Sequence, residues 1–447
     1  MKLKFMNYKT VCWLSCCFLI CNSLNCYAVT DDDKFSFPLI SSERFPASHV
    51  HYPKSIELCL PQPVAQCNAQ CIQNVQNTLD RIRQNNNIPG MQMTISYANQ
   101  PMQTFCSGTT TKDGSVLIGK NSLFEVGSIT KGFTAAVMLQ LEAEGKVNLN
   151  SFVKDWFTEN EYAQWNNITI SQLLDMTAGT FDFVETTDWM SQPLNRWTAK
   201  ELNNLSYNKG PMCELDKDHP NCPDVPGNGW DYSNNNYIIT ERIIEKASNA
   251  TLQENLYQRI LKPLGLVNTI YNTIDSPIKF DNMTHGYRVF IPKGSRNSMA
   301  DLTVDLTSVP LDGIRGAGAL ISTSEDLAKW ARALFSGKIL EVKQLKEMTS
   351  LVCTGFTSGC KPGESISYTS NESGDGYGIF HQQAVFGQPW WFDNKDSTWW
   401  HNGAYGGFQS IFLYDADKNF VITATKNTND TFWWGELLNE VSKILFT

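Results

Sequence analysis

The chain has 447 residues, of which 42% are hydrophobic and 12% aromatic, so it can bury a large core in one big domain or two closely joined ones. This composition excludes a disordered or fibrous protein. The formal net charge is -9 and the sequence has no cluster of basic residues, which argues against nucleic acid as a partner.

Residues 1–28 have the pattern of a secretory signal peptide. Three lysines within the first nine residues precede an apolar stretch, residues 11–20, and Ala28 is a candidate cleavage point. Asn22 interrupts the apolar stretch before it reaches the roughly 18 residues that a membrane span needs. The sequence therefore predicts a periplasmic or secreted protein with no membrane span after cleavage. The alternatives are an uncleaved anchor and a lipid-modified cysteine.

Thirteen cysteines are present, and five of them fall within residues 1–28. The remaining eight are an even number in an oxidising compartment, which predicts disulfides. A zinc site is not predicted, because no Cys-x-x-Cys pair occurs and the histidines are scattered. Short spacing predicts the pairs Cys213–Cys222 and Cys353–Cys360. The other four cysteines allow three pairings that the sequence does not separate: Cys59, Cys67, Cys71 and Cys106.

Residues 29–89 are predicted to form an extended arm followed by a helix over residues 66–86. The main domain, residues 90–447, begins with two predicted strands over residues 91–97 and 102–108. Residues 114–121 resemble a phosphate-binding loop, but Asn121 stands where that loop needs a serine or threonine. A strand, and not a helix, is predicted to follow it. No nucleotide or other cofactor is predicted.

The stretch Phe-Glu-Val-Gly-Ser-Ile-Thr-Lys, residues 124–131, is a short extended run that turns at a glycine and places Ser128 at the start of a helix. Ser128 and Lys131 are three residues apart, so the hydroxyl and the amine share one helix face. A lysine in a dry site can lose its proton near neutrality and activate a serine. The helix is predicted from apolar residues that recur every four positions: Phe133, Val137 and Leu141.

The Ser-x-x-Lys pattern alone is weak evidence, because it also begins at four other serines: Ser151, Ser206, Ser276 and Ser358. Only Ser128 has an extended run and a glycine before it and a long apolar helix after it. We therefore predict Ser128 as the nucleophile and Lys131 as its base. The structural alternative is an ordinary N-cap serine.

Residues 150–272 are predicted to be a mostly helical insertion, and a further helix is predicted over residues 324–335. At the end of the chain, strands over residues 408–414 and 420–425 form a predicted hairpin before a helix over residues 432–446. Because strands occur at both ends of the main domain, we predict an α+β fold with a sheet built from both termini. The predicted helices of the insertion cover residues 168–176, 202–205, 235–247 and 252–261.

Two further candidate pieces of a site are Tyr232-Ser233-Asn234 and His401-Asn402-Gly403. A phenol can relay a proton between the serine and a leaving group, and an amide can hold a substrate amide. An imidazole can hold a substrate carboxylate or polarise the phenol. The structural alternatives are a packed tyrosine and a structural histidine.

The order Ser-x-x-Lys, Tyr-Ser-Asn, His-x-Gly resembles the serine β-lactamase and penicillin-binding protein family, in particular its class C β-lactamases, D-Ala-D-Ala carboxypeptidases and related esterases. The resemblance covers roughly residue 90 to the end of the chain. It implies a central antiparallel sheet flanked by helices, beside a mostly helical region. Supporting segments lie at residues 168–180, 226–234, 261–269 and 316–330.

The resemblance also implies roles for individual residues. Ser128 would be acylated, and Lys131 and Tyr232 would share the base and acid roles. The backbone N–H groups of Ser128 and Ala404 would form an oxyanion hole. The substrate would be a small peptide, a β-lactam or an ester, and the resemblance implies no metal or cofactor. Three further residues are expected to contact the substrate: Asn234, His401 and Gly403.

The third motif departs from the Lys-Thr-Gly of the family's β-lactamases, because His401 stands in place of the lysine. We expect His401 to be a cation that anchors a substrate carboxylate. The alternative is a neutral imidazole that exchanges a hydrogen bond with Tyr232. Lys361-Pro362-Gly363 is not a substitute motif, because no strand is predicted after it.

Four tryptophans near the third motif would crowd the entrance of the site or pack in the core of the last hairpin: Trp390, Trp391, Trp399 and Trp400. The predicted function is a serine hydrolase like the D-Ala-D-Ala carboxypeptidases. The alternatives are a β-lactamase, a small-ester hydrolase and a non-catalytic binding protein. The sequence predicts no oligomeric state.

Overall fold

The computed structural model describes residues 56–446, apart from a set of internal segments. The predicted signal peptide, nearly all of the predicted arm and the predicted pair Cys213–Cys222 lie outside the described residues. The internal segments that are not described are residues 63–64, 99, 159–160, 208, 211–222, 224, 274–281, 290–302, 357–358, 368–372, 382–397 and 431–433.

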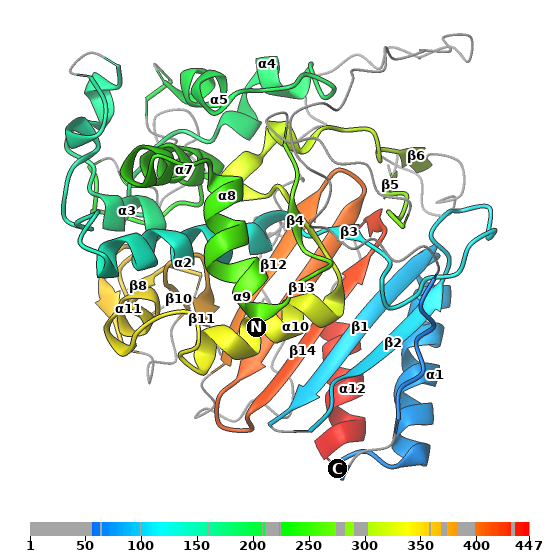
Figure 1. The fold of residues 1–447 in the computed structure, drawn as a ribbon. Helices are drawn as coiled ribbons and strands as arrows, with labels where there is room; N and C mark the ends of the chain where they lie inside the picture. Colours follow the sequence, from blue (N-terminus) through cyan, green and yellow to red (C-terminus); the bar gives the residue numbers. More distant parts are fainter. Residues whose placement is uncertain are drawn as a thin grey trace, which may run out of the picture.

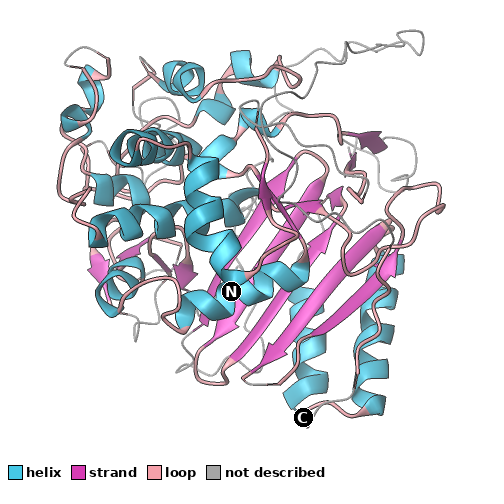
Figure 2. Ribbon diagram, viewed as in Figure 1, coloured by secondary structure: helices cyan, strands magenta, loops and turns pink. Residues whose placement is uncertain are grey.

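Nine strands of the described chain form one antiparallel sheet at the centre of the molecule (Figures 1 and 2). Their order across the sheet is β2 (Gln103–Gly108), β1 (Gly90–Tyr97), β14 (Phe420–Lys426), β13 (Phe408–Asp415), β12 (Thr398–Tyr405), β11 (Phe380–His381), β10 (Gly374–Asp375), β8 (Leu351–Cys353) and β9 (Ser365–Ile366).

The sheet joins the two ends of the main domain. β1 pairs with β2 on one side and with β14 on the other, and the register places Ile95 opposite Ile422. β13 connects β14 to β12, the strand that carries His401. The predicted α+β fold and the predicted pairing of N-terminal and C-terminal strands are confirmed.

Alternate residues of β1 meet different layers. Thr94 Oγ1 hydrogen-bonds Ser324 Oγ at 2.8 Å, and Arg332 Nε donates to Ser96 Oγ at 2.8 Å, so the polar face of β1 lies under helix α10 (Ser324–Phe335). Tyr97, one residue on, packs its ring on the opposite face against Phe446 of α12 (Trp434–Phe446). The sheet is therefore covered on both faces, which explains why β1 is buried along its whole length.

The helical region lies beside the sheet and packs around α2 (Thr130–Ala143), the helix that follows Ser128 (Figure 1). The helices predicted in the insertion are confirmed, with somewhat different ends. The remaining α-helices of the described chain are α1 (Ala69–Asn85), α3 (Ile170–Leu174), α4 (Thr187–Met190), α5 (Ala199–Ser206), α7 (Asn234–Ser248), α8 (Leu252–Leu256), α9 (Lys262–Leu264) and α11 (Val342–Met348).

The strands at the outer edge of the sheet were not predicted. Each is only two or three residues long, too short for a period-two pattern to be visible in the sequence. One of them, β9, begins two residues after Gly363, so the expectation that no strand follows Lys361-Pro362-Gly363 is wrong. β9 pairs only with β8 at the far edge of the sheet, away from β12.

Two small sheets complete the described strands. The sheet β3 (Phe124–Glu125), β7 (Leu320–Ser322), β4 (Ile270–Tyr271) leads directly into the turn that carries Ser128. The other sheet is β15 (Thr428–Asn429), β5 (Tyr287–Val289), β6 (Thr303–Asp305). No helix in the described part of the chain is both long enough and apolar enough to cross a membrane.

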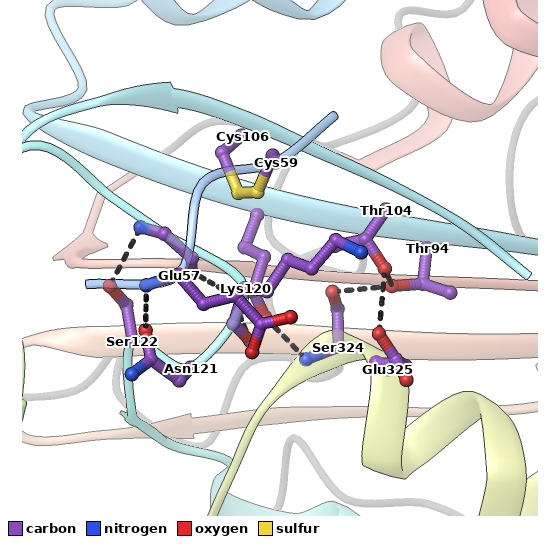
Figure 3. The surroundings of a disulfide bond; sticks show 12 residues. Glu57, Cys59, Thr94, Thr104, Cys106, Lys120, Asn121, Ser122, Ser324 and Glu325 are labelled. Carbon is purple, nitrogen blue, oxygen red and sulfur yellow. Dashed lines mark hydrogen bonds between the residues drawn. A yellow bond between two sulfur atoms is a disulfide. The ribbon is translucent and has the colours of Figure 1, made fainter. Parts of the chain in front are cut away.

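Three disulfides join described cysteines. The predicted pair Cys353–Cys360 is confirmed, and the other pairs are Cys59–Cys106 and Cys67–Cys71. Figure 3 shows how Cys59–Cys106 ties the end of the N-terminal arm to β2. The neighbouring backbone of Glu57 adds to this attachment, because its N–H donates to Asn121 Oδ1 at 3.0 Å.

Replacement of both Cys353 and Cys360 by alanine should lower the free energy of unfolding. The bond closes a loop of sequence separation 7, and its removal frees the unfolded chain, which should cost about 2 to 3 kcal/mol. Chemical denaturation of parent and variant measures the difference. An unchanged free energy of unfolding would show that this bond does not stabilise the fold.

Candidate active site

Ser128 lies where a short strand gives way to a long helix. A short 3-10 helix, Gly127–Ile129, joins β3 to α2 and carries Ser128, which is only 7% exposed. The residue that caps α2 is Ile129, and it makes no side-chain capping hydrogen bond. Ser128 is therefore not an ordinary N-cap serine, and the structural alternative is wrong.

Two glycines let β12 contact this turn. Gly127 has a φ of +51°, and a Cβ built on it would lie 2.7 Å from the backbone nitrogen of Ala404. A Cβ on Gly403 would lie 1.8 Å from the carbonyl oxygen of Val126. Any larger residue at either position would push the strand away. The Ala404 N–H is thus held beside the turn of Ser128, where an oxyanion hole needs its second donor.

The Lys131 side chain is completely buried and hydrogen-bonded to three oxygens. Its Nζ lies 3.2 Å from Ser128 Oγ, 2.7 Å from Asn234 Oδ1 and 2.9 Å from the carbonyl oxygen of Ala317. The predicted contact between the hydroxyl and the amine is present. Asn234, from the second sequence motif, meets the first motif at this nitrogen.

The three contacts define the direction of the Lys131 lone pair. An ammonium has three N–H donors and no acceptor, so a base must first lose one proton. The neutral amine keeps two N–H groups, and the two oxygens that can only accept are Asn234 Oδ1 and the carbonyl of Ala317. The remaining tetrahedral direction, the lone pair, then faces Ser128 Oγ. This is the geometry that proton abstraction from the serine requires.

Tyr232 lies against the lysine, two residues before α7 begins at Asn234. Lys131 Nζ is 4.7 Å from the centroid of the Tyr232 ring. The ring is half-buried, and its centroid is 6.4 Å from that of His401. The structure therefore brings the predicted residues of all three motifs together around one lysine, although they lie as much as 273 positions apart in the sequence.

His401 is almost completely buried on β12, with 1% exposure. Burial, and secondly the charge of Lys131, lower the pKa of His401 to about 3. The imidazole of the free protein is therefore neutral at pH 7, which argues against the expected cationic anchor. Its Nδ1 lies 2.6 Å from the carbonyl oxygen of Asn402 and donates to it, which leaves Nε2 as an acceptor. The alternative, a hydrogen bond between a neutral His401 and Tyr232, stays a prediction.

The neutral state of His401 has a consequence for the pH dependence of turnover. Substrates with and without a carboxylate should give parallel pH profiles between about pH 5 and pH 8, because the folded protein does not titrate His401 in that range. Steady-state kinetics on a matched acid and ester pair measures this. A fall near pH 6.5 for the carboxylate substrate alone would restore the cationic anchor.

The lowered pKa of His401 also affects the stability of the fold in acid. The unfolded chain takes up a proton near the ordinary histidine pKa of about 6.5, whereas the folded chain resists it down to about 3. The contribution of His401 to stability is therefore fully present above pH 6.5 and is lost progressively as the pH falls toward 3.

Comparison with known proteins agrees with this geometry. A family model described as Beta-lactamase matches residues 75–436, which is most of the chain. The chain belongs to the beta-lactamase family. It therefore shares the serine β-lactamase and transpeptidase fold.

Two similarities illustrate the range of this beta-lactamase family. Penicillin-binding protein 4* of Bacillus subtilis (strain 168) is 26% identical over 330 residues, which are 73% of this chain and 65% of that protein. The present chain thus spans about two thirds of that relative's length. The D-amino acid amidase of Ochrobactrum anthropi SV3, complexed with L-phenylalanine amide, has a similar fold, with a TM-score of 0.66 at 23% identity, covering 84% of this chain and 99% of that one.

A third similarity is to the penicillin-binding protein of Bacillus halodurans, which matches with a TM-score of 0.62 at 19% identity and covers 82% of this chain and 98% of that one. At these identities the two solved structures show the fold, and the site of this family member is described from its own residues.

Sequence reasoning missed two buried acids beside the site of this family member. Asp182 accepts a hydrogen bond from Asn234 Nδ2 at 2.8 Å, and burial, followed by the charge of Glu185, raises the pKa of Asp182 to about 7. Burial also raises the pKa of Asp375, and the charge of Lys131 opposes that shift. Asp182 could have been considered from the sequence because it lies two residues after segment 168–180, which carries part of the family resemblance.

The described tryptophans of the last strands pack in the core of this beta-lactamase family member. Trp400 is 1% exposed and stacks on Phe380 with the ring centroids 5.1 Å apart. Trp399 is 6% exposed and lies against Phe335. The core-packing alternative is correct for both. Trp390 and Trp391, which were also expected at the entrance, lie outside the described residues.

Within the residues that the structure describes, no group of three or more histidine, cysteine, aspartate or glutamate side chains could hold a metal ion.

Proposed function

We propose that this protein hydrolyses a small amide through an acyl-enzyme on Ser128 and that its substrates resemble those of D-Ala-D-Ala carboxypeptidases. The observation that carries this proposal is the buried Lys131 Nζ, 3.2 Å from Ser128 Oγ and held by two fixed acceptors. A merely structural serine would not need a buried lysine oriented toward it. This geometry argues against the alternative of a non-catalytic binding protein.

Acylation would proceed by transfer of the Ser128 proton to Lys131 as Oγ attacks the substrate carbonyl carbon. The carbonyl oxygen becomes an oxyanion, which the backbone N–H groups of Ser128 and Ala404 would stabilise. Collapse of the tetrahedral intermediate breaks the carbon–nitrogen bond. The leaving amine takes up the proton, which Lys131 supplies directly or through the Tyr232 hydroxyl.

Deacylation would follow the same path in reverse, with water in place of the amine. The water gives a proton to the Lys131 and Tyr232 pair and attacks the ester carbon of the acyl-enzyme. The second tetrahedral intermediate then releases the carboxylic acid. Ser128 recovers its proton, so the enzyme returns to its starting state with one water consumed for each amide cleaved.

The neutral His401 bears on which end of the substrate is recognised. Because its one N–H is donated to the carbonyl oxygen of Asn402, a buried neutral His401 offers a terminal carboxylate neither a charge nor a hydrogen-bond donor. We therefore infer that His401 does not select for a free carboxylate on the leaving side of the substrate, so that an amidated or esterified peptide is accepted as readily as a free acid. β-Lactams are the second candidate, favoured by the 26% identity to a penicillin-binding protein.

We also infer that the protein works outside the cytoplasm. Three disulfides join described cysteines, and such bonds persist in oxidising compartments. The pattern of residues 1–28 supports the same location.

The substrate proposal can be tested with a set of matched peptides. An N-acylated D-Ala-D-Ala peptide, its C-terminal amide and its L-Ala-L-Ala counterpart would be compared by mass spectrometry of the products. We expect the D-configured acid and amide to be cleaved at rates within about tenfold of each other, because a neutral His401 supplies no charge that would favour the free acid. Cleavage of the free acid alone would contradict the inference about His401. Failure to cleave any of the three would contradict the substrate class.

A further inference from the structure

We propose that Asp182 is a positioning residue that locks the Asn234 side chain in the one orientation that keeps Lys131 directed at Ser128. The inference rests on the proposed function, because it concerns the same proton transfer. Asp182 is 4% exposed and immediately precedes the 3-10 turn Phe183–Glu185. It contacts Asn234 from the helical region, whereas Lys131 contacts Asn234 from α2.

The Asn234 amide bridges a lysine and a carboxylate. Its Oδ1 accepts from Lys131 Nζ at 2.7 Å, and its Nδ2 donates to Asp182 Oδ2 at 2.8 Å. An asparagine amide has one acceptor, Oδ1, and one donor group, Nδ2. In this arrangement Lys131 uses the acceptor and Asp182 uses the donor. While Asp182 is ionised, only one of the two amide orientations satisfies it, because the reversed amide would place Oδ1 against a carboxylate oxygen, and Asn234 is itself fully buried, so water cannot intervene.

The reversed orientation would misdirect the base. Nδ2 of Asn234 would then point at Lys131 Nζ, and the neutral amine would accept a hydrogen bond from that amide. The lone pair of Lys131 would be occupied by Asn234 instead of facing the Ser128 hydroxyl. Asp182 prevents this outcome although it touches neither the substrate nor the serine hydroxyl in the described contacts.

Asp182 also accepts a hydrogen bond from the backbone N–H of Asn234, and it has a further contact that a test must separate from the proposed lock. Its Oδ1 accepts from the backbone N–H of Val184 at 3.3 Å and so caps the 3-10 turn. A serine can make the capping contact, because serine is a favoured N-cap residue. The serine side chain is one atom shorter and has a single oxygen, so it would not also reach Asn234. Asp182→Ser therefore removes the proposed lock and retains the cap.

Acylation of the parent and of Asp182→Ser would be followed by stopped-flow with a chromogenic ester. We expect the acylation rate constant to fall about 10- to 100-fold in Asp182→Ser, a typical effect of a residue that orients a catalytic group. The matched control is Asp175→Asn, because Asp175 is a half-buried acid of the same region that hydrogen-bonds Thr177 instead of Asn234. The control should remain within about threefold of the parent.

A double-mutant cycle distinguishes positioning from a structural role. If Asp182 acts only through Asn234, then Asp182→Ser added to Asn234→Ala should lower acylation by less than about twofold more. If Asp182 supports the fold in general, the same loss would appear with and without Asn234. An additive cycle would therefore overturn the inference even when Asp182→Ser is slow.

A spectroscopic measurement keeps the inference testable without turnover. In the parent, NMR should show one Asn234 side-chain amide proton shifted downfield by its hydrogen bond to Asp182, and Asp182→Ser should lose that shift. An unchanged chemical shift would overturn the lock. If the parent never forms an acyl-enzyme, the proposed function is refuted, but the NMR measurement still tests the role of Asp182. If the parent is acylated and Asp182→Ser has the same acylation rate constant, only the proposed role of Asp182 is refuted.

Discussion

Replacement of Ser128 by alanine should reduce turnover of amides and esters by at least about 10,000-fold, because the loss of a nucleophile disables the whole catalytic unit. The protein should still fold. The one hydrogen bond described for the Ser128 side chain is that from Lys131 Nζ, and its loss should cost about 1 kcal/mol. Steady-state kinetics measures the first effect and chemical denaturation measures the second.

The alternative serines of the Ser-x-x-Lys pattern provide the controls for this variant. Ser151→Ala and Ser206→Ala should keep the parental rate, because Ser151 and Ser206 follow different local structures and neither contacts Lys131 in the described hydrogen bonds. Residual turnover of Ser128→Ala above about 1% of the parent would contradict the assignment of the nucleophile.

Replacement of Lys131 by methionine should be nearly as severe, with at least about a 1,000-fold fall in the acylation rate constant. Methionine is unbranched, one atom shorter than lysine and tolerated in buried positions, but it has no nitrogen to take the Ser128 proton. The variant should also unfold more easily by about 1 to 3 kcal/mol, because Asn234 Oδ1 and the carbonyl of Ala317 would lose their donor.

Two comparisons show whether the loss in Lys131→Met is specific. Lys329 on α10 is a partly buried, ion-paired lysine away from the site. Lys329→Met should therefore keep the parental acylation rate. The double variant Ser128→Ala with Lys131→Met should be no slower than either single variant, because the two residues act as one unit. A double variant at least tenfold slower than both would show that they act independently.

The parts of the fold that the sequence predicted are those with local patterns. The helix over residues 324–335 and the hairpin near the end of the chain follow from period-3.6 and period-two apolar patterns. The strands β8, β9, β10 and β11 have two or three residues each and show no period. Their existence depends on pairing with distant strands, which a local pattern does not record.

The site was predictable as a set of residues but not as a set of charges. Ser128, Lys131, Tyr232 and His401 carry recognisable patterns, and the fold brings them together. The neutral state of His401 comes from burial between β11 and β13 and from the nearby Lys131 charge, both of which are tertiary effects. A histidine in place of a lysine therefore suggested a cation when only the residue type was known.

Asp182 illustrates a different limit. Its contact with Asn234 joins residues 52 positions apart, and an isolated aspartate before a short turn has the pattern of an ordinary cap. Only the direction of the Asn234 amide, set by Lys131 on its other side, gives that aspartate a role in the chemistry.

The account depends most directly on a covalent bond to Ser128. The protein would be mixed with an activated ester and with a labelled penicillin, quenched within milliseconds to seconds, and digested for mass spectrometry. We expect an acyl adduct on the peptide that contains residues 124–131, localised to Ser128, and no adduct in Ser128→Ala. An adduct on a different serine, or hydrolysis by the parent with no acyl-enzyme and undiminished in Ser128→Ala, would contradict the account.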